Sequence, residues 1–438
     1  MSLHSRRDAD WWGAGLLESR PSDAPWAIAR STVSYGQLRA QVSSLRHTLR
    51  SYGIGAGNTV ALQGARSFTQ MWALLALWSC GAQVMLMGPG LRGRELGTLL
   101  DRCRPQYHLS FDAPGWAAGT FHDECEVLVR RLKGGRPAET PHCLVQFTSG
   151  STGIAKAIGR TPESLTTELG RFRAIGGMPR DGERALLLAP PEHSFGLIGG
   201  LLHAMNAGAV TVFARDTGPR AVLEACRAHD VDAVLGAPAH FAGLAALPGS
   251  VEPPVAPGPP GPPAASPASP AFPAHGGAAP LPRLRTAVSA GDVLVRQVAT
   301  RFAERFGVRI GQAYGTTETG IIAVDTAGVH GPGTVGVPAP GVRVRLVSGE
   351  LQVRLPGSPY LAPEDPPARF LADGGRDPGG WLCTRDLVEV DPAGGALRLL
   401  GRLDPPADRR GLTAGATQRQ VTDRTIVRQL GRDGSLAI

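Results

Sequence analysis

The stretch LVQFTSGSTGIAKAIGRT, residues 144–161, decides most of what the sequence predicts about fold and function. Its apolar start predicts a buried strand, which enters a turn of serine, threonine and glycine that is followed by Lys156. Gly150 and Gly153 let the backbone approach a ligand and turn N–H groups toward it. A Walker loop is excluded because GK[ST] is absent, and the alternative to a ligand site is a flexible Ser/Gly turn. Four hydroxyl side chains add donors that suit a polyphosphate: Thr148, Ser149, Ser151 and Thr152.

Lysine is rare in this chain. It occurs at Lys133 and Lys156 only, and the other 43 of the 45 Lys and Arg residues are arginine. Arginine can replace lysine where a diffuse positive charge is enough, but not where a compact ammonium is required. Lys156 is therefore a candidate for chemistry.

Composition excludes several classes of protein. The net charge is +8, but no run of five or six basic residues occurs, which favours a solvated surface over a nucleic-acid site. The six cysteines form no CxxC pair, so a zinc ribbon is not supported and reduced thiols are expected. The chain starts without the apolar segment of a signal peptide, and the charge-free residues 71–87 predict a buried helix and a strand. We expect a cytoplasmic protein with no nucleic-acid partner and no membrane span.

Helices and strands alternate along most of the sequence. Apolar residues at helical spacing predict a helix over residues 34–53, and apolar segments at 59–64 and 82–88 predict strands. The same alternation returns over residues 184–245 and 284–315. This pattern predicts an α/β fold with parallel sheets.

The expected organisation is two packed parallel-sheet subdomains and a small β-rich subdomain. Residues 1–180 form the first α/β subdomain, with the phosphate loop, and residues 181–330 form the second. Short β segments place residues 331–403 in the β-rich subdomain, and residues 404–438 form a short hinge and tail. A proline-rich insertion, residues 250–282, interrupts the second subdomain and cannot supply a helix or a central strand.

Two motifs in this order resemble the adenylate-forming superfamily, which includes acyl- and aryl-CoA ligases, peptide-synthetase adenylation domains and luciferases. They are TSGSTGIAK and GQAYGTTETG, the latter at residues 311–320. The usual first motif has proline and glycine beside the lysine, where this chain has Ala155 and Ala157. The resemblance extends over about residues 25–404 and implies that Lys156 and the loop N–H groups hold the β- and γ-phosphates of ATP.

The second motif implies a binding loop for the rest of the nucleotide. By resemblance, Tyr314 stacks on adenine, Thr317 contacts the α-phosphate and Glu318 binds Mg²⁺, while Gly315 and Thr316 belong to the same loop. These roles agree with the chemistry of the residues, because a ring offers a flat face, a hydroxyl donates to phosphate and a carboxylate is a hard ligand for magnesium.

A third segment, PPEHSFGLIGG at residues 190–200, resembles the wall of the family's acyl pocket, with His193 and Phe195 at its mouth. Relatives that activate amino acids carry an aspartate here for the substrate ammonium, whereas this chain has Glu192. We therefore expect a carboxylic acid without an α-amino group. The residues SAGD at 289–292 correspond to another wall of the pocket.

A fourth segment, GGWLCTRDLVEVD followed by LRLLGRLD, resembles the family's ribose-binding and hinge motifs. By resemblance, Asp386 holds the ribose hydroxyls, Arg402 contacts ribose or phosphate, and Asp404 is the hinge. Arg385 stands where the family has glycine, which places a bulky cation beside the ribose.

The resemblance implies ATP-dependent activation of a carboxylic acid to acyl-AMP, with Mg²⁺, and transfer to CoA or to a carrier-protein thiol. In the family a mobile C-terminal lid supplies a further lysine. This sequence has no lysine after Lys156, so we expect the lid domain to be missing and adenylation by the chain alone to be slow. Two alternatives follow: a non-catalytic nucleotide- or acyl-binding descendant, and one half of a split ligase that needs a separate lid-domain partner.

Overall fold

The computed structural model describes residues 11–112, 119–148, 156–247, 281–361, 369–373 and 379–403. The turn from Ser149 to Ala155, almost all of the proline-rich segment and the expected hinge and tail from Asp404 onward lie outside the described residues.

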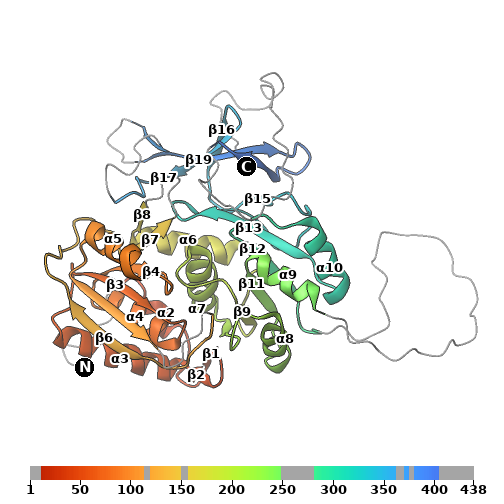
Figure 1. Cartoon of the computed structure of the whole chain (residues 1–438). Helices are drawn as coiled ribbons and strands as arrows, with labels where there is room; N and C mark the ends of the chain where they lie inside the picture. Colours follow the sequence, from red (N-terminus) through yellow and green to blue (C-terminus); the bar gives the residue numbers. More distant parts are fainter. Residues whose placement is uncertain are drawn as a thin grey trace, which may run out of the picture.

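Three sheets organise the described residues (Figure 1). The six-stranded sheet has the order β6-β5-β3-β4-β7-β8, in which the four central strands are parallel and both edge strands are antiparallel. Its strands are β3 (Thr59–Gly64), β4 (Gln83–Met87), β5 (Tyr107–Asp112), β6 (Glu126–Arg131), β7 (Leu144–Thr148) and β8 (Lys156–Arg160). The preceding and intervening helices and the helix after β8 are α2 (Ala14–Glu18), α3 (Tyr35–Ser51), α4 (Phe68–Ser79), α5 (Gly93–Cys103) and α6 (Pro162–Ala174).

The nine-stranded sheet has the order β15-β14-β13-β12-β11-β9-β10-β1-β2 and is parallel from β13 to β1. Its strands are β1 (Pro25–Ile28), β2 (Thr32–Ser34), β9 (Arg184–Leu187), β10 (Val210–Val212), β11 (Ala233–Gly236), β12 (Thr286–Ala290), β13 (Ile310–Thr316), β14 (Gly320–Asp325) and β15 (Val337–Pro338). The helices between its strands are η1 (Phe195–Leu202), α7 (His203–Ala207), α8 (Pro219–Ala228), α9 (Pro238–Ala246) and α10 (Arg296–Phe306).

The third sheet is small and antiparallel, and it lies above the other two in Figure 1. It has the order β16-β17-β19-β18, with β20 paired to β19. Its strands are β16 (Val344–Val347), β17 (Glu350–Leu355), β18 (Phe370–Ala372), β19 (Gly380–Val390) and β20 (Leu397–Arg402). The expected α/β class, with two large sheets and a small β-rich part, is confirmed, and both large sheets are mixed rather than purely parallel.

One apolar core joins the two large sheets. Its centre is a group of aromatic rings in which Phe68 of α4 packs against Trp26 of β1 and against Phe121 and Phe213. Every residue of α4 from Phe68 to Trp78 is buried. This burial explains the charge-free sequence of α4 and β4. None of the helices in the described segments is long and apolar enough to span a membrane.

The strand pairing crosses the subdomain boundaries expected from sequence. β1 and β2 come from the first 180 residues but belong to the nine-stranded sheet, where Ala27 pairs with Thr211. β15, which follows residue 330, also joins that sheet. Pairing between distant segments depends on contacts that no local pattern encodes.

A π-helix replaces part of an expected helix. The sequence from Phe195 to Gly208 predicts one continuous helix, but η1 is an eight-residue π-helix that continues into α7. A Cβ at Gly196 would collide with the Pro190 carbonyl, and one at Gly199 would press on the ring of Phe172. Glycine therefore lets the wider turns of η1 pack against the loop after β9 and against α6.

The β16–β17 hairpin offers a test of turn chemistry. Its two-residue loop, Ser348–Gly349, has φ angles of 49° and 79°. Because asparagine tolerates positive φ better than serine, Ser348→Asn should raise the stability by about 0.5 kcal/mol, and Ser348→Val should lower it. Urea midpoints measure both changes, and a lower midpoint for the asparagine variant would contradict the assignment of this turn.

Candidate nucleotide site

Three side chains predicted from separate motifs meet where the nine-stranded and five-stranded sheets adjoin. The Tyr314 hydroxyl, on β13, donates to Asp386 Oδ2 at 2.5 Å, and Arg402 Nε on β20 lies 3.0 Å from Asp386 Oδ1. Asp386 is only 7% exposed, and its own N–H donates to Thr384 Oγ1. Burial, and next the Asp386 carboxylate, raise the pKa of Tyr314, so the phenol stays protonated and remains a donor.

Arg385 occupies the position where the resemblance has glycine. Its φ angle is 67°, a left-handed conformation that side chains with a Cβ rarely adopt. Its N–H donates to Glu350 Oε1 at 2.9 Å, and its carbonyl accepts from the Leu403 N–H at 2.8 Å. The chain therefore keeps the backbone shape suited to glycine, and Asp386 still faces Tyr314.

The turn between β13 and β14 carries Thr317 and Glu318, both half-buried. Thr316 and Thr319 brace this turn: each backbone N–H donates to the other residue's Oγ1, at 3.2 and 3.3 Å, and the two hydroxyls lie 3.1 Å apart. Gly315, just before the turn, is exposed. These bonds fix the backbone at both ends of the turn that would present a hydroxyl and a carboxylate to a bound nucleotide.

Lys156 begins β8, directly opposite Thr148 at the end of β7. It is 8% exposed, whereas Thr148 is half-buried. The predicted phosphate ligands Ser149, Gly150, Ser151, Thr152 and Gly153 lie outside the described residues. The structure therefore places the two ends of the phosphate turn side by side.

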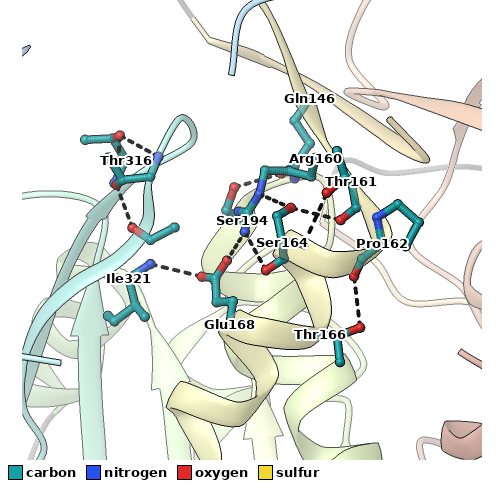
Figure 2. A network of polar contacts seen from close by, with 12 residues as sticks. Gln146, Arg160, Thr161, Pro162, Ser164, Thr166, Glu168, Ser194, Thr316 and Ile321 are labelled. Carbon is teal, nitrogen blue, oxygen red and sulfur yellow. Dashed lines mark hydrogen bonds and ion pairs between the residues drawn. The ribbon is translucent and has the colours of Figure 1, made fainter. Parts of the chain in front are cut away.

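The His193 loop is held by two glutamines that the sequence did not single out. Gln146 on β7 donates from Nε2 to the Glu192 carbonyl at 2.8 Å. Its Oε1 accepts from Ser194 Oγ at 2.7 Å (Figure 2). Gln70 on α4 donates to Glu192 Oε1 at 2.9 Å. His193 itself is exposed, and its two neighbours, Glu192 and Ser194, are hydrogen-bonded to Gln146. A polar residue inside the apolar segment LVQF is the signal that could have marked Gln146.

Glu318 suits a magnesium ion that is shared with phosphate oxygens. Across the part of the chain that the structure describes, no group of three or more His, Cys, Asp or Glu residues could hold a metal ion. Magnesium is commonly bound by one or two carboxylates together with substrate phosphates and water. The half-buried carboxylate of the 317–319 turn fits such a shared site.

Several known proteins resemble this chain in sequence. The chain is 32% identical over 272 residues to the benzoate–CoA ligase of Thauera aromatica, an alignment that covers 58% of this chain and 45% of that protein. It is 26% identical over 401 residues to a feruloyl-CoA synthase of a Streptomyces species, covering 83% and 72%. The chain thus spans less than half of the first relative's length.

Solved structures share the fold at low identity. The ATP-bound MatB of Rhodopseudomonas palustris superimposes with a TM-score of 0.68 at 18% identity, covering 89% of this chain and 78% of that one. The inhibitor-bound N-terminal domain of FACL13 from Mycobacterium tuberculosis gives 0.66 at 18%, covering 90% of this chain and all of that domain. The family model described as AMP-binding enzyme matches residues 17–359. The chain therefore belongs to the AMP-binding, adenylate-forming enzyme family and is similar to its acyl- and aryl-CoA ligases.

Proposed function

We propose that this chain binds ATP with Mg²⁺ where the three sheets meet and activates a carboxylic acid as its acyl-adenylate. The observation that carries the proposal is the Tyr314–Asp386–Arg402 cluster, which gathers a ring, a carboxylate and a guanidinium from two sheets. Lys156 adds a compact cation at the end of the phosphate turn.

Each residue has a distinct task in this proposal. The ring of Tyr314 faces adenine, and Asp386 accepts hydrogen bonds from the ribose hydroxyls, with Arg402 beside it. Lys156 neutralises charge on the β- and γ-phosphates, and the Thr317 hydroxyl donates to the α-phosphate. Magnesium, when held by Glu318, neutralises further phosphate charge.

The reaction needs no protein nucleophile. A carboxylate oxygen of the acid attacks the α-phosphorus, the bond to the β-phosphate oxygen breaks, and pyrophosphate leaves. The protein supplies positioning and charge neutralisation. In the second step a thiol sulfur, of CoA or of a carrier protein, attacks the acyl carbon and AMP leaves.

An aromatic acid is the substrate class that the relatives favour. Among them are ligases named for benzoate, for ferulate and for anthranilate. Glu192 is already engaged by Gln70, which supports an acid without an α-amino group.

The test is pyrophosphate release by the full chain with ATP, Mg²⁺ and a panel of aromatic, aliphatic and amino acids. We expect release with aromatic acids, and thioester formation is then measured separately, with and without a lid domain from a full-length relative. Rescue by the added lid would support the split ligase. Calorimetric ATP binding without release in any mixture would instead support a nucleotide-binding role.

Gln146 provides a prediction about the His193 loop. Gln146→Leu removes the hydrogen bonds to the Glu192 carbonyl and to the Ser194 side chain, the two neighbours of His193, so the rate of acyl transfer should fall about tenfold. The matched control is Gln83→Leu on β4, since Gln83 is equally buried and donates to the His142 carbonyl and to Thr140. Both variants should lose stability, but only the first should lose rate. Equal rates for the two variants would contradict this role of Gln146.

A further inference from the structure

A buried ion pair joins the strand that carries Lys156 to helix α6. Arg160 ends β8, four residues after Lys156, and its Nη2 lies 2.5 Å from Glu168 Oε2. The two side chains are only 6% and 2% exposed. Arg160 also donates from Nε to Ser164 Oγ at 3.1 Å and from Nη2 to the Ser164 carbonyl at 3.3 Å, as Figure 2 shows.

The second oxygen of the same carboxylate reaches the nine-stranded sheet. The Ile321 N–H of β14 donates to Glu168 Oε1 at 2.9 Å. Ile321 follows Gly320, which has a φ angle of 70° and lies so close to the carboxylate that a Cβ there would collide with it. The carboxylate of Glu168 is therefore fitted against the backbone at the foot of the turn that carries Thr317 and Glu318 (Figure 2).

Stability alone is a weak reason for such a pair. Removing two charges from water is so unfavourable that well-packed apolar residues of similar size are often as stable as a buried ion pair. What the pair adds is geometry, because a single carboxylate bonds β8 of one sheet and β14 of another. Lys156 begins β8, and the 317–319 turn leads directly into β14. These are the two parts of the proposed ATP site that contact phosphate.

We propose that Arg160 and Glu168 are positioning residues that hold the Thr317–Glu318 turn in place relative to Lys156. The expected effect on the reaction rate rests on the proposed function. The anchoring of the turn stands on the contacts alone. If the turn moves by about 1 Å, the rate should fall about 10²-fold, because α-phosphate and metal contacts depend on it.

The variant that tests the proposal is Arg160→Met with Glu168→Leu, which replaces both charges by apolar side chains so that no buried charge is left unpaired. Glu168→Gln is the second variant, since it removes the charge and keeps an oxygen that can accept from Ile321. The matched control is Asp232→Asn. Asp232 is also buried, pairs with Arg283 at 3.2 Å and accepts from the Arg184 N–H, but it lies before β11, at the opposite end of the sheet.

The first readout is hydrogen exchange of the full chain without ligand. In the double variant, the backbone amides of residues 316–321 should exchange at least about tenfold faster, since the amide of Ile321 loses a charged acceptor. Residues 286–290 of β12 should be unchanged in the double variant, and the control variant should leave residues 316–321 unchanged. Unchanged exchange at 316–321 in the folded double variant overturns the proposal.

The second readout is pyrophosphate release as a function of Mg²⁺. Both Glu168 variants should show a kcat lower by about 10²-fold and a higher Mg²⁺ midpoint, with the KM for the acid unchanged, and Asp232→Asn should keep wild-type values. Wild-type kcat and Mg²⁺ midpoint in the folded double variant would also overturn the proposal. If the wild-type chain releases no pyrophosphate even with an added lid domain, while the double variant exchanges faster at residues 316–321, the proposed function is refuted and the anchoring role stays supported.

Discussion

Replacing Lys156 with methionine is expected to weaken ATP binding by about 10- to 150-fold. Methionine keeps most of the length of the side chain but removes the ammonium, and a charge-assisted contact in a desolvated site is worth about 1.5–3 kcal/mol. Lys156→Arg should recover only part of the affinity, because a planar guanidinium cannot take the place of a compact ammonium.

The control is Lys133→Met, because Lys133 is the other lysine of the chain and is exposed. Calorimetry with ATP·Mg²⁺ compares the three variants with the wild type, and thermal melting checks that each is folded. The same affinity for the wild type and Lys156→Met would remove Lys156 from the site.

Asp386→Asn is expected to lower kcat/KM for ATP by about 10²-fold. The amide keeps one oxygen but has lost the charge that faces Arg402, and its NH₂ group cannot accept from a second donor. The ribose hydroxyls would therefore lose the acceptor that the proposal assigns to them.

A second nucleotide makes this prediction specific to the ribose. The wild type should prefer ATP over 2′-deoxyATP. The Asp386 variant should lose that preference, because the ribose 2′-hydroxyl has already lost its acceptor and its removal has no further effect. The control is Asp325→Asn, a buried carboxylate that caps the Val329 and His330 N–H groups and should keep the preference. A variant of Asp386 that discriminates as strongly as the wild type would show that another group reads the ribose.

Much of the architecture could be predicted from local patterns. The helical spacing at residues 34–53 corresponds to α3, where Ser34 and Gln37 form a capping box, and the charge-free stretch corresponds to the buried α4 and β4. Motifs also identified Tyr314, Asp386 and Arg402, which the fold brings into contact. Their tasks in catalysis remain predictions.

The contacts that organise the site could not be predicted in this way. Glu168 bonds a backbone N–H that lies 153 residues further along the chain, and Gln146 bonds residues 46 and 48 positions away. Neither contact leaves a periodic pattern, because each depends on how two elements pack. The π-helix was also missed, since its apolar sequence is compatible with an ordinary helix until packing against Pro190 and Phe172 is considered.

The place of β1 and β2 has a consequence for how the chain can assemble. These strands leave the ribosome early, but β10, to which β1 pairs, is synthesised only after the whole six-stranded sheet has emerged. The edge of β1 that pairs with β10, at Ala27 and Ile28, therefore has no partner while the first sheet folds. A fragment that stopped before β9 would leave that edge open to pairing with other chains. The two large sheets are therefore expected to fold as one cooperative unit rather than one after the other.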